Sequence, residues 1–314
     1  MNATSDTTHD VAVIGAGPAG IAAATALARS LRSVVVIDAG EPRNRFAAHA
    51  HNVLGSEGLS PLAINARGRE DAQAYGAEFR EGRVTRIERT GDGFVVGIDG
   101  EQDELRVRRV ILATGLIDVL PELPGLAERW GRTVLHCPYC HGYEVRGQRI
   151  AVLATGPNAT HQALLFRQLS DDVTVVVQPG GEPDAESAML LAAVGVRVIE
   201  AAATAVEGGA ALRLADGSLL EADAVVVGPR FTVRGELFEQ LGGTLTAQPM
   251  TGLPTIDVDF SGRTAVDGVW AAGNARDLMA QVSSSAAQGV MAGAAVNGDL
   301  VMADARAAAG LTAV

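Results

Sequence analysis

The chain contains two cysteines, Cys137 and Cys140, in the run HCPYCHG that spans residues 136–142. Cys-x-x-Cys spacing brings two sulfurs within disulfide range and often places one thiol at a helix start, where its pKa falls. Two histidines, His136 and His141, flank the pair, and histidine can take or give a proton near neutral pH. These residue types at this spacing predict a redox-active dithiol with a histidine nearby to act as base.

Two other interpretations of the cysteine pair are weaker. A zinc site would need two more soft ligands at a suitable spacing. The remaining histidines supply no such pair; they are His9, His49, His51 and His161. A secreted scaffold would use more cysteines, spread along the chain. We therefore expect no metal site and favour a redox dithiol over a metal ligand or an inert pair.

A glycine motif, GAGPAG at residues 15–20, follows an apolar strand and opens a helix. In such a motif Gly15 permits the tight turn, Gly17 lets the backbone approach a pyrophosphate, and Gly20 lets helix and strand pack closely. The helix start offers N–H groups and a positive dipole to the phosphates. Asp38 ends the next strand, where a carboxylate can accept hydrogen bonds from ribose hydroxyls. The motif predicts a dinucleotide site without separating FAD from NAD.

Two later pieces of the sequence favour FAD. Residues 113–115 (ATG) end one strand, and residues 273–274 (GN) end another, followed by QVS at 281–283. A long ligand that is contacted by several separated loops suits FAD better than NAD.

Composition excludes several classes of protein. The chain of 314 residues has a net charge of −12 and only 4% aromatic residues, so it would repel a nucleic-acid backbone and offers few stacking platforms. No apolar run approaches the roughly 20 residues of a membrane span. The first nine residues lack the basic start and apolar core of a signal peptide. We expect a cytoplasmic protein that binds neither nucleic acid nor membrane.

The strand–turn–helix–strand plan of residues 10–38 is repeated from residue 149, where Ile150–Ala159 aligns with Val11–Gly20. Each copy can form a three-layer α/β domain. We predict an α/β fold of two Rossmann-like domains, with the second inserted into the first. The FAD domain is expected at residues 1–118 and 229–314, and the inserted domain, with the cysteines, at 119–228.

The order of these parts resembles the low-molecular-weight thioredoxin reductases, from Asp10 to about Leu300. The resemblance implies a homodimer in which FAD lies against the cysteine pair, Cys140 faces the flavin and Cys137 exchanges with the substrate. It also implies a set of cofactor contacts. These are Gly15, Gly17, Pro18, Ala19, Gly20, Asp38, Ala39, Arg45, Asn52, Val84, Ala113, Thr114, Gly115, Gly273, Asn274, Gln281 and Val282.

The sequence departs from that family at two places. His141 stands where the reductases usually carry an acid after the second cysteine. In the inserted domain, Ala154 replaces the first glycine of the nucleotide motif, and residues 178–183 contain Glu182 but no arginine for a 2′-phosphate. These departures argue against NADPH as a cofactor.

The departures resemble one branch, the flavin dithiol oxidases that close the disulfides of gliotoxin, holomycin and romidepsin. The matching stretches are residues 43–44, 49–55, 136–144 and 272–274. The resemblance implies a small-molecule dithiol substrate, O2 as electron acceptor and H2O2 as product. It makes His136 or His141 the base, with Asn44 either orienting that histidine or contacting the flavin.

Three alternatives remain from sequence. One is an NADPH-dependent reductase of thioredoxin or a similar protein, and another is a reductase fed by ferredoxin. The third is a flavoprotein that senses or binds without turnover, which the intact cysteine pair disfavours.

Overall fold

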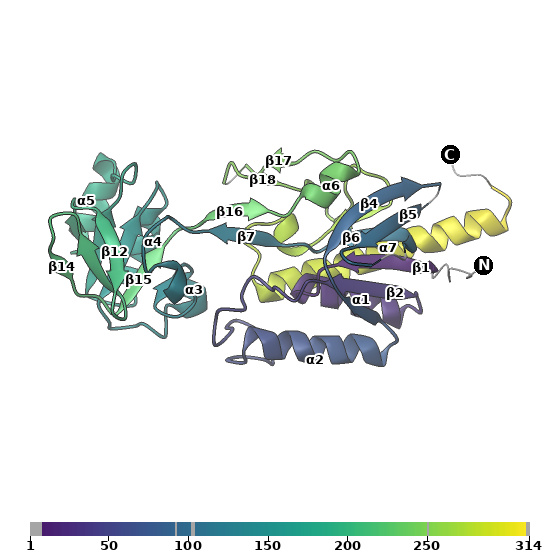
Figure 1. Ribbon diagram of the computed structural model, residues 1–314, viewed down its shortest axis with the longest axis horizontal. Helices are drawn as coiled ribbons and strands as arrows, with labels where there is room; N and C mark the ends of the chain where they lie inside the picture. Colours follow the sequence, from purple (N-terminus) through teal and green to yellow (C-terminus); the bar gives the residue numbers. More distant parts are fainter. Residues whose placement is uncertain (1–7, 92, 102–103, 250, 312–314) are drawn as a thin grey trace. The chain divides into compact units, whose positions relative to one another are not determined.

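The computed structural model describes residues 8–91, 93–101, 104–249 and 251–311 (Figure 1). Residues 1–7, part of the polar N-terminal stretch considered above, lie outside this description. The chain divides into two compact units. The first unit comprises Met1–Arg45, Pro61–Ile117 and Phe231–Val314, and the second comprises Phe46–Ser60 and Asp118–Arg230.

The first unit is built on a seven-stranded sheet of order β3-β2-β1-β6-β5-β4, with β19 paired to β6. Its strands are β1 (Thr8–Ile14), β2 (Val34–Asp38), β3 (Glu78–Glu81), β4 (Val84–Thr90), β5 (Gly93–Ile98), β6 (Leu105–Leu112) and β19 (Val269–Ala271). The pairings of β1, β2, β3, β6 and β19 are parallel, while β4 and β5 add an antiparallel edge. The parallel strands end at one edge of the sheet, where dinucleotides bind in folds of this type.

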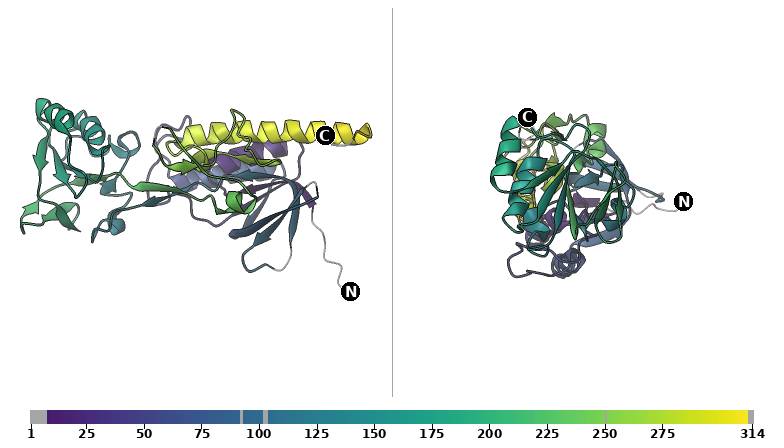
Figure 2. Two further views of the ribbon diagram at one scale, coloured as in Figure 1. Left: turned by 90° about the horizontal axis from the view of Figure 1, so that it is seen from above. Right: turned by 90° about the vertical axis from the view of Figure 1, so that its left-hand side faces the viewer.

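Helices complete the first unit. They are α1 (Pro18–Arg29), α2 (Pro61–Ala74), α6 (Glu236–Gln240) and α7 (Val282–Ala308), with the 3-10 turn η2 (Gly273–Ala275) and the short strands β17 (Thr246–Ala247) and β18 (Pro254–Thr255). The long helix α7 runs beside α1 (Figures 1 and 2). Their close approach depends on small residues, because a Cβ atom on Gly289 of α7 would collide with the carbonyl oxygen of Ala19.

The second unit holds a five-stranded parallel sheet of order β11-β10-β9-β15-β8. These strands are β8 (Val134–Leu135), β9 (Ile150–Ala154), β10 (Val173–Val177), β11 (Arg197–Ile199) and β15 (Ala224–Val227). A small antiparallel sheet contains β12 (Ala203–Glu207), β13 (Ala211–Leu214) and β14 (Leu219–Leu220). The helices are α3 (Pro138–His141), α4 (Ala159–Arg167), α5 (Ala185–Ala193) and the 3-10 turn η1 (Ala127–Arg129).

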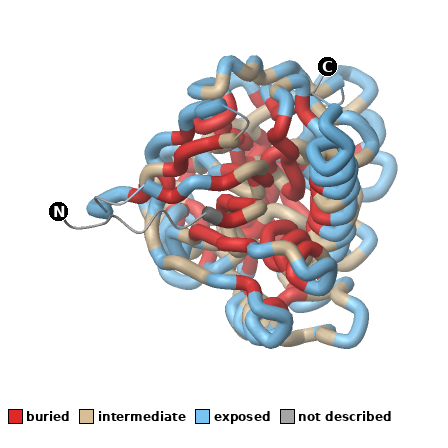
Figure 3. Tube along the Cα trace, turned by 90° about the vertical axis from the view of Figure 1, so that its right-hand side faces the viewer, coloured by how far each residue is buried: buried red, intermediate tan, exposed pale blue. Residues whose placement is uncertain are grey.

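Strands β7 (Leu116–Val119) and β16 (Arg230–Val233) pair where the chain passes from one unit to the other and back. The central strands β9, β10 and β15 are buried at every residue, as expected for parallel strands covered on both faces. Buried positions follow the interior strands, and exposed positions follow loops and outer helix faces (Figure 3).

The predicted fold class, two Rossmann-like domains of which the second is inserted, is confirmed. The structure groups residues 46–60 with the second unit, unlike the expected division, and its other boundaries lie within two residues of the expected ones. Among the described residues, no helix combines the length and the apolar character needed to cross a membrane.

Candidate active site

The cysteine pair lies at the start of α3 in the second unit. Cys137 is the N-cap residue, with extended backbone angles, and Cys140 lies in the single turn of helix that follows. Their Sγ atoms are 2.6 Å apart, and both residues are half-buried. The two sulfurs are therefore placed to react with each other, and a small molecule can still reach them.

His136 is held by the body of the second unit. Its Nδ1 lies 3.2 Å from the carbonyl oxygen of Val227 and 3.2 Å from Nε2 of Gln162. Gln162 is buried and also donates to the His136 carbonyl oxygen at 2.6 Å. Val227 and Gln162 belong to β15 and α4, so these contacts fix the imidazole against the sheet and leave it little freedom to turn.

His141 differs from His136 in its surroundings. Its Nε2 is buried and has no hydrogen-bond partner among the described residues. Burial lowers the pKa of His141 below 6.5; the Glu144 carboxylate opposes this shift, while His51 and His49 add to it. A buried polar atom without a partner is costly and calls for a functional explanation. His141 is thus an uncharged imidazole near neutral pH, and no described residue bonds its Nε2.

The loop of residues 46–60 lies against the cysteine segment within the second unit. Asn52 Nδ2 donates to the carbonyl oxygen of Tyr139 at 2.9 Å. His51 Nε2 lies 3.4 Å from a carboxylate oxygen of Glu144. Asn52, which is predicted to contact the cofactor, therefore also bonds the backbone between the two cysteines.

The glycine motif forms a cradle at the start of α1 in the first unit. Gly15 has φ +103°, and a Cβ atom there would lie 2.5 Å from the Ala113 carbonyl oxygen. A Cβ atom on Gly20 would collide with the Gly15 carbonyl oxygen, whereas one on Gly17 would meet open space. Gly17 is also the N-cap of α1, and no side chain caps the helix. The first-turn N–H groups are therefore available to a pyrophosphate.

The other predicted cofactor residues of the first unit surround strand ends of the same sheet. Asp38 accepts from Ala16 N at 2.8 Å and from Gly40 N at 3.0 Å, which still leaves a carboxylate lone pairs for ribose hydroxyls. Ala113, Thr114 and Gly115 follow β6, and the Thr114 hydroxyl donates to the Arg234 carbonyl oxygen at 2.9 Å. Pro18 and Ala19 open α1, and Ala39 follows β2.

The segment around η2 is braced by long-range hydrogen bonds. Gly273 N donates to Gln288 Oε1 at 2.9 Å, and Asn274 Oδ1 accepts from Arg43 Nη1 at 3.3 Å. Gln281 is the N-cap of α7 without a side-chain cap, and Val282 is the first residue of that helix. This helix start is a second set of backbone donors on the first unit.

Three predicted residues lie outside these clusters. Asn44 is half-buried in a turn of the first unit, and Arg45 in the same turn is exposed and donates to the Pro42 carbonyl oxygen at 3.1 Å. Val84 opens β4, where it is buried in the core of the first unit.

In the second nucleotide motif, the loop that follows β10 packs on Ala154. Gln178 N donates to the Ala154 carbonyl oxygen at 3.0 Å, and the Gly181 backbone packs on the same carbonyl so tightly that a Cβ atom there would collide with it. The only charged side chain of residues 178–183 is Glu182. These residues do not fit the 2′-phosphate of NADPH, which requires cationic side chains.

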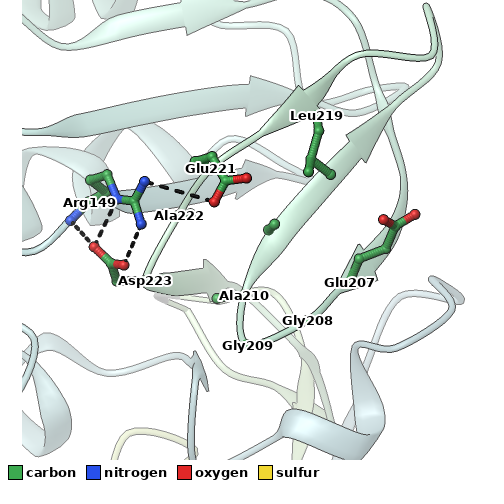
Figure 4. Close-up of a pocket in the computed structure, with 10 residues that line it drawn as sticks. Arg149, Glu207, Gly208, Gly209, Ala210, Leu219, Glu221, Ala222 and Asp223 are labelled. Carbon is green, nitrogen blue, oxygen red and sulfur yellow. Dashed lines mark hydrogen bonds and ion pairs between the residues drawn. The ribbon is translucent and has the colours of Figure 1, made fainter.

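A depression elsewhere on the second unit contains none of the predicted site residues (Figure 4). It is bordered by Arg149, which pairs with Asp223 at 2.7 Å. The described residues also contain no group of three or more His, Cys, Asp or Glu side chains arranged to hold a metal ion.

Sequence reasoning missed Gln162, Glu57 and Gln288, which support His136, His51 and Gly273. Gln162 and Gln288 contact residues 26 and 15 positions away, whereas Glu57 contacts His51 six positions away in the same loop. A polar residue such as Gln162 on the apolar face of a helix is the one sequence signal that could have pointed to such a role.

A paired dithiol beside an uncharged histidine, carried on a fold with an open glycine cradle, defines a flavin-dependent disulfide oxidoreductase. The chain belongs to the pyridine nucleotide-disulphide oxidoreductase family, whose model matches residues 9–289. The thioredoxin reductase sirT of Leptosphaeria maculans is 33% identical, over 96% of this chain and 97% of its own length.

Two solved structures are also similar. HlmI shares 43% sequence identity, with a TM-score of 0.90 over 98% of this chain and 96% of its own. An oxidoreductase from Agrobacterium tumefaciens shares 37% identity, with a TM-score of 0.89 over 94% of this chain and 99% of its own. The resemblance to thioredoxin reductases is thereby confirmed across nearly the whole chain.

Proposed function

We propose that this protein is an FAD-dependent dithiol oxidase that closes a disulfide in a small-molecule dithiol of natural-product type and uses O2 as electron acceptor. The observation that carries the proposal is the contrast within the second unit. The dithiol site is intact, with Cys137 and Cys140 adjacent, while the nucleotide loop folds onto Ala154 and offers no cation. Such a unit keeps thiol chemistry and lacks the means to take electrons from NADPH.

The residues of the first unit fit FAD. The phosphates would meet the uncapped start of α1, and Asp38 would accept from the ribose. The rest of the FAD molecule would be held by residues 113–115, by residues 273–274 and by the start of α7. The chemistry that FAD supplies when bound is the uptake of two electrons from the dithiol and their transfer to O2, with H2O2 as product.

The cysteine pair performs the exchange. A substrate thiolate attacks Cys137 Sγ of the disulfide, the Cys137–Cys140 bond breaks, and Cys140 leaves as a thiolate. The second substrate thiolate then attacks the substrate sulfur of the mixed disulfide and releases Cys137. The substrate is oxidised to a disulfide, the pair is reduced by two electrons, and two protons are released.

We assign His141 as the base that takes a proton from a substrate thiol. Its Nε2 is buried without a hydrogen-bond partner among the described residues, and its lowered pKa keeps the ring uncharged. His136 is instead assigned to holding the start of the cysteine segment, because Val227 and Gln162 occupy its Nδ1. Asn44 remains a candidate for orienting the histidine or contacting the flavin.

The alternatives are reductases that run in the opposite direction. The name of the relative sirT favours a thioredoxin reductase, but residues 178–183 lack the cation that NADPH needs. A reductase that takes its electrons from ferredoxin would also lack the NADPH motif. The net charge of −12 would, however, repel an acidic ferredoxin. By analogy with the resembling family, we also propose a homodimer.

The experiment is a steady-state assay of the purified yellow protein with a small dithiol in air. The proposal predicts one O2 consumed and one H2O2 formed for each disulfide, with no requirement for NADPH. Disulfide formation without O2 uptake, or turnover only with NADPH, would contradict it. A Cys137→Ser variant is the matched control and should show no turnover above the uncatalysed rate.

A further inference from the structure

Three side chains near the dithiol are not used by the reaction above: Glu57, His51 and Glu144. Glu57 Oε1 lies 2.7 Å from His51 Nδ1, and Glu57 Oε2 accepts from Asn52 N at 2.9 Å. The carboxylate is thus fixed by its own loop and accepts a hydrogen bond from the imidazole. This bond places a proton on Nδ1 of His51 and directs Nε2 toward Glu144.

The opposite side of the His51 ring meets the segment that follows the cysteines. Nε2 is buried and lies 3.4 Å from Glu144 Oε1, at ion-pair distance but without hydrogen-bond geometry. If Nε2 carries no proton, its lone pair points at a lone pair of the carboxylate oxygen and the contact is repulsive. If Nε2 carries a proton, the contact is an ion pair. A second bond, from Asn52 to the Tyr139 carbonyl oxygen at 2.9 Å, holds the loop in place on the same segment.

Glu144 matters because it acts on His141. Its carboxylate raises the pKa of His141, against burial and the ring charges of His51 and His49, which lower it. The helix α4 packs against α3 and carries two further basic groups. These are His161, which is exposed, and Arg167, which pairs with Asp171 at 2.5 Å.

We propose that His51, held by Glu57, is a positioning residue of the dithiol site that neutralises Glu144 and so keeps His141 ready to accept a proton from the substrate. The inference rests on the proposed function, in which His141 is the base. It gives the loop of residues 46–60 a defined task, since the loop supplies both His51 and the carboxylate that orients it.

The test compares His51→Gln and Glu144→Gln in the flavin-loaded protein. His51→Gln removes the imidazole that faces Glu144, Glu144→Gln removes the carboxylate, and each keeps a polar side chain at the position. One readout is the titration of the His141 ring by nitrogen-15 NMR, assigned with His141→Gln. The other is the pH profile of dithiol oxidation in a single turnover. His161→Gln is the matched control, because His161 is exposed on α4.

The two substitutions are expected to act in opposite directions. His51→Gln leaves the Glu144 charge unbalanced, so the pKa of His141 rises and the acid limb of the pH profile moves to higher pH. Glu144→Gln removes that charge, so the pKa of His141 falls and the acid limb moves to lower pH. In the double variant the pKa and the acid limb return toward the wild-type values, and His161→Gln leaves them unchanged.

Equal losses of rate at every pH, with no change in the His141 titration, would overturn the inference and leave His51 with a structural role alone. If the His51 variant does not retain flavin, the downward shift expected of Glu144→Gln tests the same claim, and its absence overturns it. Failure of the proposed base is seen separately. If His141→Gln keeps the wild-type rate and acid limb while the NMR shifts occur as expected, the electrostatic inference stands and the assignment of His141 as base is wrong.

Discussion

Cys137 and Cys140 are separated by two residues, yet the proposed reaction gives them different tasks. Cys137 caps the start of α3, and Cys140 lies within its turn. If Cys137 is the cysteine that exchanges with the substrate, its thiolate in Cys140→Ser can attack the disulfide of a dithiol blocked at one sulfur. This forms a mixed disulfide, releases one blocked thiol, and leaves no second cysteine to resolve the adduct. Intact-mass spectrometry of that variant with this disulfide should show one substrate adduct, and Cys137→Ser should show none. An adduct on Cys137→Ser alone would reverse the assignment.

The assignment of His141 as the base leads to a second prediction at this scale. His141→Gln should lower the rate of dithiol oxidation by about 100- to 10,000-fold near neutral pH, the usual contribution of a general base. Because burial lowers the pKa of His141 below 6.5, the neutral base persists as pH falls, and the wild-type acid limb lies below that value. The limb should be absent in the variant. An acid limb that survives the substitution would show that another group takes the proton.

Sequence reasoning reached the reacting residues but not those that support them. The cysteines and their flanking histidines are adjacent in the chain, so spacing alone exposes them. Choosing between His136 and His141 required the contacts of Val227 and Gln162, which come from distant elements. No local pattern contains that information.

At the scale of elements, the packing of α1 on α7 positions the glycine cradle at the start of α1. A Cβ atom on Gly289 would collide with the Ala19 carbonyl oxygen, whereas one on Gly298 meets nothing within 4 Å. We expect Gly289→Ala to destabilise the protein by about 1 to 3 kcal/mol through overpacking and to weaken FAD retention, because the start of α1 must move.

Gly298→Ala is the matched control in the same helix. It should be neutral or stabilise the protein by about 0.5 to 1 kcal/mol, because alanine favours a helix over glycine. Denaturant unfolding and the ratio of flavin to protein absorbance measure both effects. Equal stability and equal flavin retention in the two variants would mean that α1 and α7 can move apart enough to accept a methyl group at Gly289.

The elements themselves were predictable where one pattern repeats. The strand–glycine–helix–strand plan identified β1, α1 and β2, and its copy identified β9, α4 and β10. The loop of residues 46–60 was not predictable, because its apolar residues follow neither a helix nor a strand period. Its position depends on contacts such as that of Asn52 with Tyr139, which lies 87 positions away.

At the scale of the whole molecule, the two Rossmann-like units have diverged from each other. The first keeps its three glycines and its acid, while the second has Ala154 at the first position and a loop that packs on it. The duplicated fold was evident from sequence, and so was the missing arginine. The closure of the loop onto Ala154 was not, because it depends on backbone packing at Gly181.

The absorbance of the bound flavin under anaerobic conditions tests the central claim most directly. One sample receives a small dithiol and the other receives NADPH, each in stoichiometric amount, and air is then admitted. The account predicts that the dithiol bleaches the flavin, that NADPH does not, and that the colour returns on aeration with formation of H2O2. Rapid bleaching by NADPH would contradict the account and assign the chain to the NADPH-dependent reductases despite Ala154 and the missing arginine.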